Sequence, residues 1–336
     1  MSRPQLINGN SMNKTGMKRY VKPILRFVIS FGAIGLILFF FRKQLPAVFA
    51  NLSGANPGYF LVAVGIFLLG LIAVAIRLQL VLNVHETRLS VLKVYYMNLV
   101  ALFFNNVLPS SVGGDMVKAY YIYKSSNGNV ATFSAVVVDR LFGLVTMIGI
   151  GVTAIFLFDQ ALASPKILSS VVILAAMTVV LGVIIFNSKI VDTLCSLRVP
   201  FIPMVLLDKL RNIYQAMHYY RDHKGLIIGC IFLTILGQVS FVFTNFMLAK
   251  SLAIDISLGF FFYFVPIILI MGIAPSINGI GVREATYLFY LTGFTTTDKA
   301  LALSLFTSFF MIFVGIIGGV IYAFVGGLPA IRDMSE

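Results

Sequence analysis

Charged side chains occur within stretches of this chain that are otherwise apolar. They are Asp115 and Lys118, Asp139 and Arg140, and Arg283 and Glu284. Ionisable groups are costly inside a membrane unless they are paired or line a wet cavity, so they are functional candidates by default. The chemistry open to them is electrostatic binding of a charged headgroup, or proton transfer on Asp115, Asp139 and Glu284.

Two of these stretches contain copies of one motif. The first copy reads PSSVGGDMVKAYYIY from Pro109 to Tyr123, and the second reads PSINGIGVREATYLF from Pro275 to Phe289. Both begin with Pro-Ser, and both share Gly, Ala and Tyr at corresponding positions. Proline removes a backbone donor and glycine permits unusual conformations, so each copy is predicted to break a helix. Paired breaks of this kind in a membrane chain are typical of transport sites.

A short helix is predicted after each break, beginning near Asp115 and near Val282. Its free N–H groups present a positive dipole end that suits a phosphate. Interrupted backbone survives in hydrocarbon only where protein or a water-filled cavity satisfies it. The predicted substrate-binding residues are Pro109, Ser110, Gly113, Gly114, Asp115, Lys118, Asp139, Arg140, Pro275, Ser276, Asn278, Gly279, Gly281, Arg283 and Glu284. We predict no catalytic residue, no metal site and no cofactor.

Structural interpretations of the same residues remain open. Either motif alone is also typical of a helix kink, and Gly113-Gly114 is also typical of a turn. Asp139 and Arg140 lie in a segment long enough to place them near the membrane interface.

Two arginines carry specific expectations. Arg77 is five residues from the end of its span, so we expect it to snorkel to the interface. Arg283 needs a partner of its own, and Asp115, Asp139 or a lipid phosphate is expected to supply it.

The composition indicates a polytopic integral membrane protein. Hydrophobic residues make up 59% of the 336 residues and charged residues 11%, and the mean hydropathy is +0.98. A soluble domain would concentrate its apolar residues in one core. The net charge of +13 comes from basic residues beside apolar spans, which anionic headgroups explain without nucleic acid. Cys195 and Cys230 have no metal-like spacing.

The predicted fold is all-α, with a single membrane domain at 27–326 between tails at 1–26 and 327–336. Full crossings are expected at 27–41, 59–82, 130–158, 167–187, 225–249 and 300–325. The basic tail at 1–26 and the basic, amphipathic segment at 188–224 both favour the cytoplasm. We therefore expect an uncleaved first span and a cytoplasmic N-terminus.

The motif segments are predicted to be re-entrant hairpins at 94–124 and 258–291. Loop charges place both ends of the first hairpin in the cytoplasm, and three crossings then separate the two motifs. The hairpins should therefore enter the membrane from opposite sides, as in inverted-repeat transporters. The alternative is that both hairpins cross fully, which gives eight spans. Gly315 and Gly319 form a Gly-x-x-x-Gly pair that indicates close helix packing.

The order and spacing of three motifs resemble a known family. They read LPSSVGGDMVKAYYIY, VVVDRLFGL and APSINGIGVREA. They are similar to the lysylphosphatidylglycerol synthase transmembrane family, the flippase-like membrane half of the bacterial multiple peptide resistance factor. The resemblance covers about residues 20–325 and implies a prokaryotic plasma-membrane protein, in a bacterium the inner membrane, that handles anionic or aminoacylated phospholipid.

The resemblance also implies which residues act. The family's Gly-Gly-Asp motif falls on Gly113, Gly114 and Asp115, its acid-Arg pair on Asp139 and Arg140, and its Gly-x-Arg-Glu on Gly281, Arg283 and Glu284. The chain departs from the family pattern with Lys118 in place of Arg, Asp139 in place of Glu and Asn278 in place of Gly. The soluble aminoacyl-transferase domain of full-length relatives is not among these residues, so aminoacyl transfer by this chain is not expected.

The leading hypothesis is a lipid translocase that passes a headgroup through a polar cavity at the membrane midplane. An alternative is an enzyme, or enzyme subunit, for aminoacyl or glycosyl transfer to phospholipid or polyprenyl phosphate. A third is a membrane scaffold for a separate lipid-modifying transferase. The expected partner is an anionic lipid in each case, and the sequence does not specify an oligomeric state.

Overall fold

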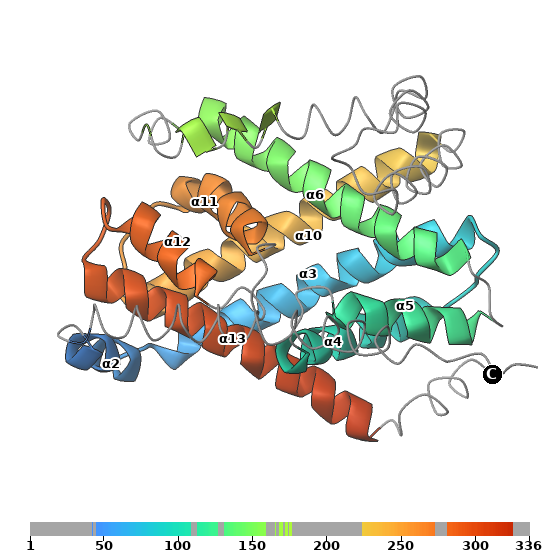
Figure 1. Ribbon diagram of the computed structural model, residues 1–336, viewed down its shortest axis with the longest axis horizontal. Helices are drawn as coiled ribbons and strands as arrows, with labels where there is room; N and C mark the ends of the chain where they lie inside the picture. Colours follow the sequence, from blue (N-terminus) through green and yellow to red (C-terminus); the bar gives the residue numbers. More distant parts are fainter. Residues whose placement is uncertain are drawn as a thin grey trace, which may run out of the picture.

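The computed structural model describes residues 42, 45–108, 113–126, 131–158, 165, 168–170, 172–173, 175–176, 224–272 and 281–324. Within these residues every long element is an α-helix (Figure 1). The predicted all-α fold is therefore confirmed.

Four of the helices are long and apolar enough to cross a membrane. They are α3 (Pro57–Asn83), α6 (Ala131–Leu157), α10 (Lys224–Ser251) and α13 (Thr297–Phe324). Each coincides with a predicted crossing to within a few residues. The protein is thus a multi-pass membrane protein, as its composition indicates.

Other predictions concern residues that the structure does not describe. The span at 27–41, the tails at 1–26 and 327–336, and all but Lys224 of the segment 188–224 lie outside the described residues, as does most of the span at 167–187. These remain predictions.

One helix was not predicted from the sequence. Helix α2 (Leu45–Ser53) precedes α3 and is too short to give a span-like apolar run. Its Asn51 side chain donates to Asp298 Oδ2 at the start of α13, with an N–O distance of 3.0 Å. Asn56 then caps α3 by accepting the Gly58 N–H at 2.8 Å, directly before Pro57 at the first helical position.

The two motif regions form helical hairpins. The first consists of α4 (Val91–Val107) and α5 (Gly113–Ser125), and the second of α11 (Leu258–Met271) and α12 (Val282–Leu291). The first arm of each begins at a serine N-cap, Ser90 in one and Ser257 in the other. The hairpins therefore share a start signal as well as a break.

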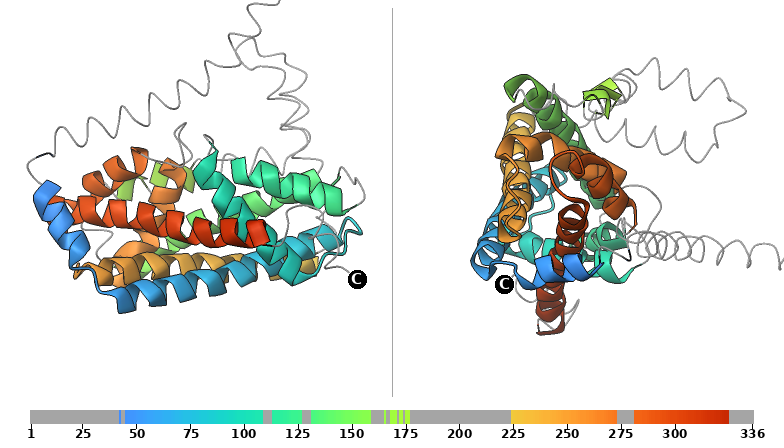
Figure 2. Two further views of the ribbon diagram at one scale, coloured as in Figure 1. Left: turned by 90° about the horizontal axis from the view of Figure 1, so that it is seen from below. Right: turned by 90° about the vertical axis from the view of Figure 1, so that its left-hand side faces the viewer.

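Each hairpin begins and ends at the same end of the helix bundle. The first hairpin starts and finishes at the end where Gln79 donates to the Leu89 carbonyl, which we call the Leu89 end. In the second hairpin the rings of Phe260 and Phe294 lie 4.7 Å apart, which joins the start of α11 to the residues just after α12. This second hairpin lies at the Asn56 end, and both views show the pairs in opposite halves of the bundle (Figures 1 and 2).

This arrangement matches the predicted inverted hairpins. The ten residues of α12 cover about 15 Å of helix, half of a hydrocarbon core about 30 Å thick. An arm of that length is too short to cross such a core by itself.

Helix α13 contacts the end of α4 and the start of α12. Asn106, at the end of α4, donates from Nδ2 to the Met311 carbonyl at 3.0 Å. Glu284, at the start of α12, accepts from Ser308 Oγ at 3.1 Å. Ser308 and Met311 lie one turn apart near the middle of α13, so the end of α4 and the start of α12 come close together there.

Glycines allow α13 to approach α4 closely. A Cβ atom on Gly318 would lie 2.0 Å from the Leu99 carbonyl oxygen, and one on Gly315 would lie 2.1 Å from Asn106 Nδ2. Gly319 faces the Phe103 ring in the same contact. The helix packing predicted for Gly315 and Gly319 is confirmed, and α4 is the partner.

We predict that Gly318→Ala destabilises the protein by about 1–3 kcal/mol, because the methyl group must displace backbone of α4 rather than a flexible side chain. Thermal unfolding of the detergent-solubilised protein measures the effect. Gly65→Ala in α3 is the matched control, since nothing lies within 4 Å of its added Cβ. Equal melting temperatures for the two variants would contradict the proposed close contact.

Candidate functional site

The structure describes nine of the predicted substrate-binding residues. They are Gly113, Gly114, Asp115, Lys118, Asp139, Arg140, Gly281, Arg283 and Glu284. Pro109, Ser110, Pro275, Ser276, Asn278 and Gly279 lie outside the described residues. The site is therefore built from the arms that follow each break and from α6.

Glycine positions the first short helix against its neighbour. A Cβ atom on Gly114 would lie 2.0 Å from the Ala101 carbonyl oxygen of α4. The Gly114 N–H donates to Asn105 Oδ1 at 2.8 Å, which satisfies one of the free donors at the start of α5. This contact fixes the start of α5, the helix that carries Asp115 and Lys118.

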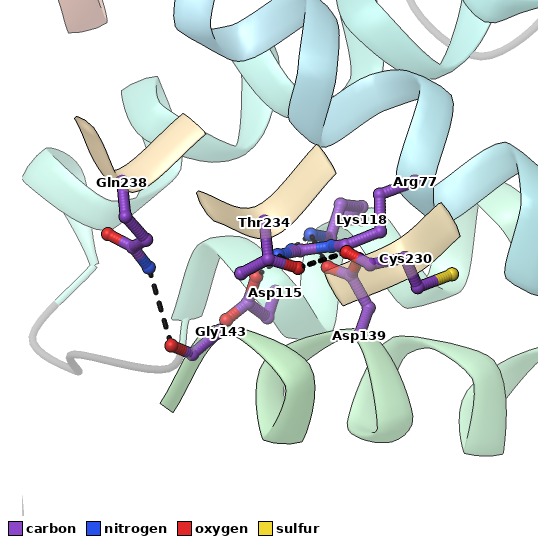
Figure 3. A network of polar contacts seen from close by, with 8 residues as sticks. All are labelled: Arg77, Asp115, Lys118, Asp139, Gly143, Cys230, Thr234 and Gln238. Atoms are coloured by element: carbon purple, nitrogen blue, oxygen red, sulfur yellow. Dashed lines mark hydrogen bonds and ion pairs between the residues drawn. The ribbon is translucent and has the colours of Figure 1, made fainter. Parts of the chain in front are cut away.

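Ion pairs join α3, α5 and α6 in a cluster that is buried except at Arg140 (Figure 3). Arg77 Nε lies 2.6 Å from Asp139 Oδ1. Lys118 Nζ lies 3.3 Å from Asp115 Oδ1 and 3.9 Å from Asp139 Oδ2. Arg140 pairs with Asp115 Oδ2. These five residues comprise three cations and two carboxylates, so the cluster itself carries a surplus positive charge.

The expectation that Arg77 snorkels is wrong. Arg77 is 5% exposed, and its Nη1 donates to Thr234 Oγ1 of α10 at 3.1 Å. Helices α6 and α10 both pack against α3 at this level and supply its polar partners, so the side chain has no need to reach the interface. Asp139 is buried as well, with 2% of its surface exposed. Arg140 differs, since its side chain is 42% exposed.

The second motif is organised by a helix cap. Gly281 has a φ of 85°, a conformation that favours glycine, and its N–H donates to Glu284 Oε2 at 2.5 Å. The other carboxylate oxygen of Glu284 accepts from Ser308. Both oxygens of Glu284 are thus engaged in starting α12 and tying it to α13.

Arg283 is buried beside this cap, with 9% of its surface exposed. Its expected partners, Asp115 and Asp139, are held by Lys118, Arg140 and Arg77. The pairing expected for Arg283, with one of these acids or with a lipid phosphate, stays a prediction.

Aligned on their prolines, the motifs place Tyr121 opposite Tyr287 and Lys118 opposite Glu284. Both tyrosines are buried. The Tyr287 hydroxyl lies 3.2 Å from Asn245 Oδ1 and 3.1 Å from Thr307 Oγ1. The charges at the other matched pair are opposite, so the repeat conserves shape while the two halves differ electrostatically.

A separate open cavity of about 530 Å³ lies at the Leu89 end. It is lined by Gln79, Asn83, Arg88, Leu89 and Ser90. None of the predicted substrate-binding residues lines it. Among the described residues there is also no group of three or more His, Cys, Asp or Glu side chains placed to hold a metal ion.

The fold and site define a multi-pass helical membrane protein with two broken hairpins and a buried, cationic charge cluster. The sequence profile of the lysylphosphatidylglycerol synthase TM region matches residues 24–319, and the chain belongs to this family. A UPF0104 membrane protein of Methanocaldococcus jannaschii is 23% identical over 260 residues, which cover 71% of this chain and 75% of that protein. The family resemblance seen in the motifs is confirmed.

We predict that Glu284→Ala lowers the free energy of unfolding by about 1 kcal/mol or more, because it removes the cap of α12. Glu284→Gln should retain most of the stability, since glutamine also serves at this position of a capping box. Chemical or thermal unfolding of the purified variants measures both. A glutamine variant as unstable as the alanine variant would show that the charge of Glu284 matters more than the cap.

Proposed function

We propose that this protein is a membrane lipid translocase. It moves the headgroup of an anionic or aminoacylated phospholipid through a polar cavity at mid-depth, while the acyl chains stay in the bilayer. The observation that carries this proposal is the meeting of two inverted, broken hairpins one turn apart on α13. Broken helices of inverted orientation that meet near the midplane form the substrate sites of many transporters.

The charges of the first hairpin support an anionic ligand. Lys118 and Arg140 each pair with Asp115, and both are donors that a phosphate accepts equally well. A phosphate oxygen that replaces Asp115 would keep these cations compensated while the headgroup passes. Arg283 on α12 offers a further cation to the same headgroup on the other side of the midplane.

We propose a prokaryotic plasma membrane, the inner membrane in a bacterium, as the location, with the N-terminus in the cytoplasm. On this orientation the Leu89 end faces the cytoplasm and the Asn56 end faces outward. The buried charge cluster then lies in the cytoplasmic half of the bilayer. A separate lipid-modifying transferase is the proposed source of aminoacylated headgroups.

Purified protein in liposomes with a fluorescent phosphatidylglycerol analogue tests this function. Loss of the outer-leaflet signal to a membrane-impermeant quencher reports movement between leaflets, and chromatography of the extracted lipid reports chemical conversion. The translocase predicts movement with unchanged lipid. Conversion of the lipid, or no movement across several anionic lipids, would overturn the proposal.

We predict that Lys118→Gln slows this movement about tenfold, the effect of losing one charge-assisted hydrogen bond to the phosphate. Arg283→Ala should slow it by a similar factor. Lys250→Gln serves as the control, because Lys250 pairs with Asp255 in a loop at the Asn56 end, where the Asp255 side chain is 97% exposed. Movement at the wild-type rate in both the Lys118 and Arg283 variants would contradict the proposed site.

A further inference from the structure

We propose that Arg77 is a positioning residue for Lys118. By holding the Asp139 carboxylate in a close ion pair, Arg77 leaves the Lys118 ammonium available to the phosphate of an anionic lipid. This role rests on the proposed translocase function. Arg77 lies on α3, outside both copies of the motif and outside the family motifs that the sequence shares.

The distances show that the two cations contact different oxygens of Asp139, one closely and one loosely. Arg77 occupies Oδ1 at 2.6 Å, whereas Lys118 lies 3.9 Å from Oδ2. Lys118 is also 3.3 Å from Asp115 Oδ1, so it sits between two carboxylates and is held tightly by neither. Asp139 therefore pairs more closely with Arg77 than with Lys118.

Burial strengthens the interactions among these three charges. The side chains of Arg77, Asp139 and Lys118 are 6%, 3% and 7% exposed. Charges in such surroundings interact more strongly than in water, and a buried carboxylate without a partner is strongly disfavoured. Without Arg77, Asp139 would draw in Lys118 and compete with the lipid phosphate for it.

The guanidinium is itself held in place from α10. Thr234 Oγ1 accepts from Arg77 Nη1 at 3.1 Å, while the Thr234 hydroxyl donates to the Cys230 carbonyl at 2.5 Å. Because its proton is committed to Cys230, the Thr234 oxygen presents a lone pair to Arg77. A planar guanidinium can serve Asp139 and Thr234 at once, and lysine, a single point charge, does so poorly.

Removing the two charges together provides the test. In Arg77→Gln, Asp139 should capture Lys118, so movement of the phosphatidylglycerol analogue should slow about tenfold. In the Arg77→Gln/Asp139→Asn double variant the competing carboxylate is gone, so most of the lost rate should return. In a purely structural role the stranded Asp139 charge would lower the melting temperature of Arg77→Gln, and the double variant would restore melting temperature and rate together. The positioning role instead requires that Arg77→Gln lose rate while its melting temperature stays close to that of the wild-type protein.

The exposed pair of Lys250 and Asp255 supplies a matched control. Its N–O distance is 2.7 Å, close to that of the buried pair, and the hydrogen bond from Lys250 lowers the pKa of Asp255. Lys250→Gln, Asp255→Asn and their double variant should all leave the transport rate unchanged. Thermal stability and size-exclusion profiles are measured for every variant.

The possible outcomes separate failure of the translocase function from failure of the positioning role. No movement by the wild-type protein overturns the translocase function itself. Movement by the wild-type protein together with a double variant as slow as Arg77→Gln overturns the positioning role alone. If Arg77→Gln does not fold, Asp139→Asn decides: it removes the carboxylate that competes for Lys118 and should raise the apparent affinity for the anionic lipid. An unchanged or lowered affinity would overturn the role.

Discussion

The arrangement of this protein depends on the need to satisfy interrupted backbone deep within a helical bundle. A helix that stops at mid-depth leaves donors and acceptors that hydrocarbon does not satisfy. Here the starts of the two short helices find acceptors: Gly114 donates to Asn105 of the neighbouring α4, and Gly281 donates to Glu284 of its own helix. Asn106 and Ser308 then tie the two tips to α13. Side chains thus replace the hydrogen bonds that a continuous helix would have made.

Buried charge imposes a second requirement on the same region. A carboxylate among apolar helices needs cations within contact distance, and here they come from different segments: Arg77 from α3, Lys118 from α5 and Arg140 from α6. Such a network fixes the mutual orientation of three helices, because losing one partner strands another charge. The cluster is therefore a structural clamp as well as a candidate binding site.

Much of this fold was accessible from the sequence. Apolar run lengths located α3, α6, α10 and α13, and the proline and glycine pattern located both breaks. Local signals were sufficient because helix length and helix interruption are properties of a single segment. The buried state of Arg77 was not accessible, since it depends on Asp139 and Thr234, which lie far away in the chain. The cap at Glu284 could have been found, because its spacing from Gly281 is that of a capping box.

The short distance along α13 between Ser308 and Met311, which contact the two hairpins, has a mechanical consequence. Asn106 belongs to the hairpin that starts at the Leu89 end, and Glu284 belongs to the hairpin that starts at the Asn56 end. Both side chains nevertheless contact the same turn of α13. A shift of α13 along its axis would therefore move the end of α4 and the start of α12 in the same direction. One hairpin is then pushed back toward its own membrane face while the other is drawn deeper, so the two faces respond in opposite senses to a single displacement.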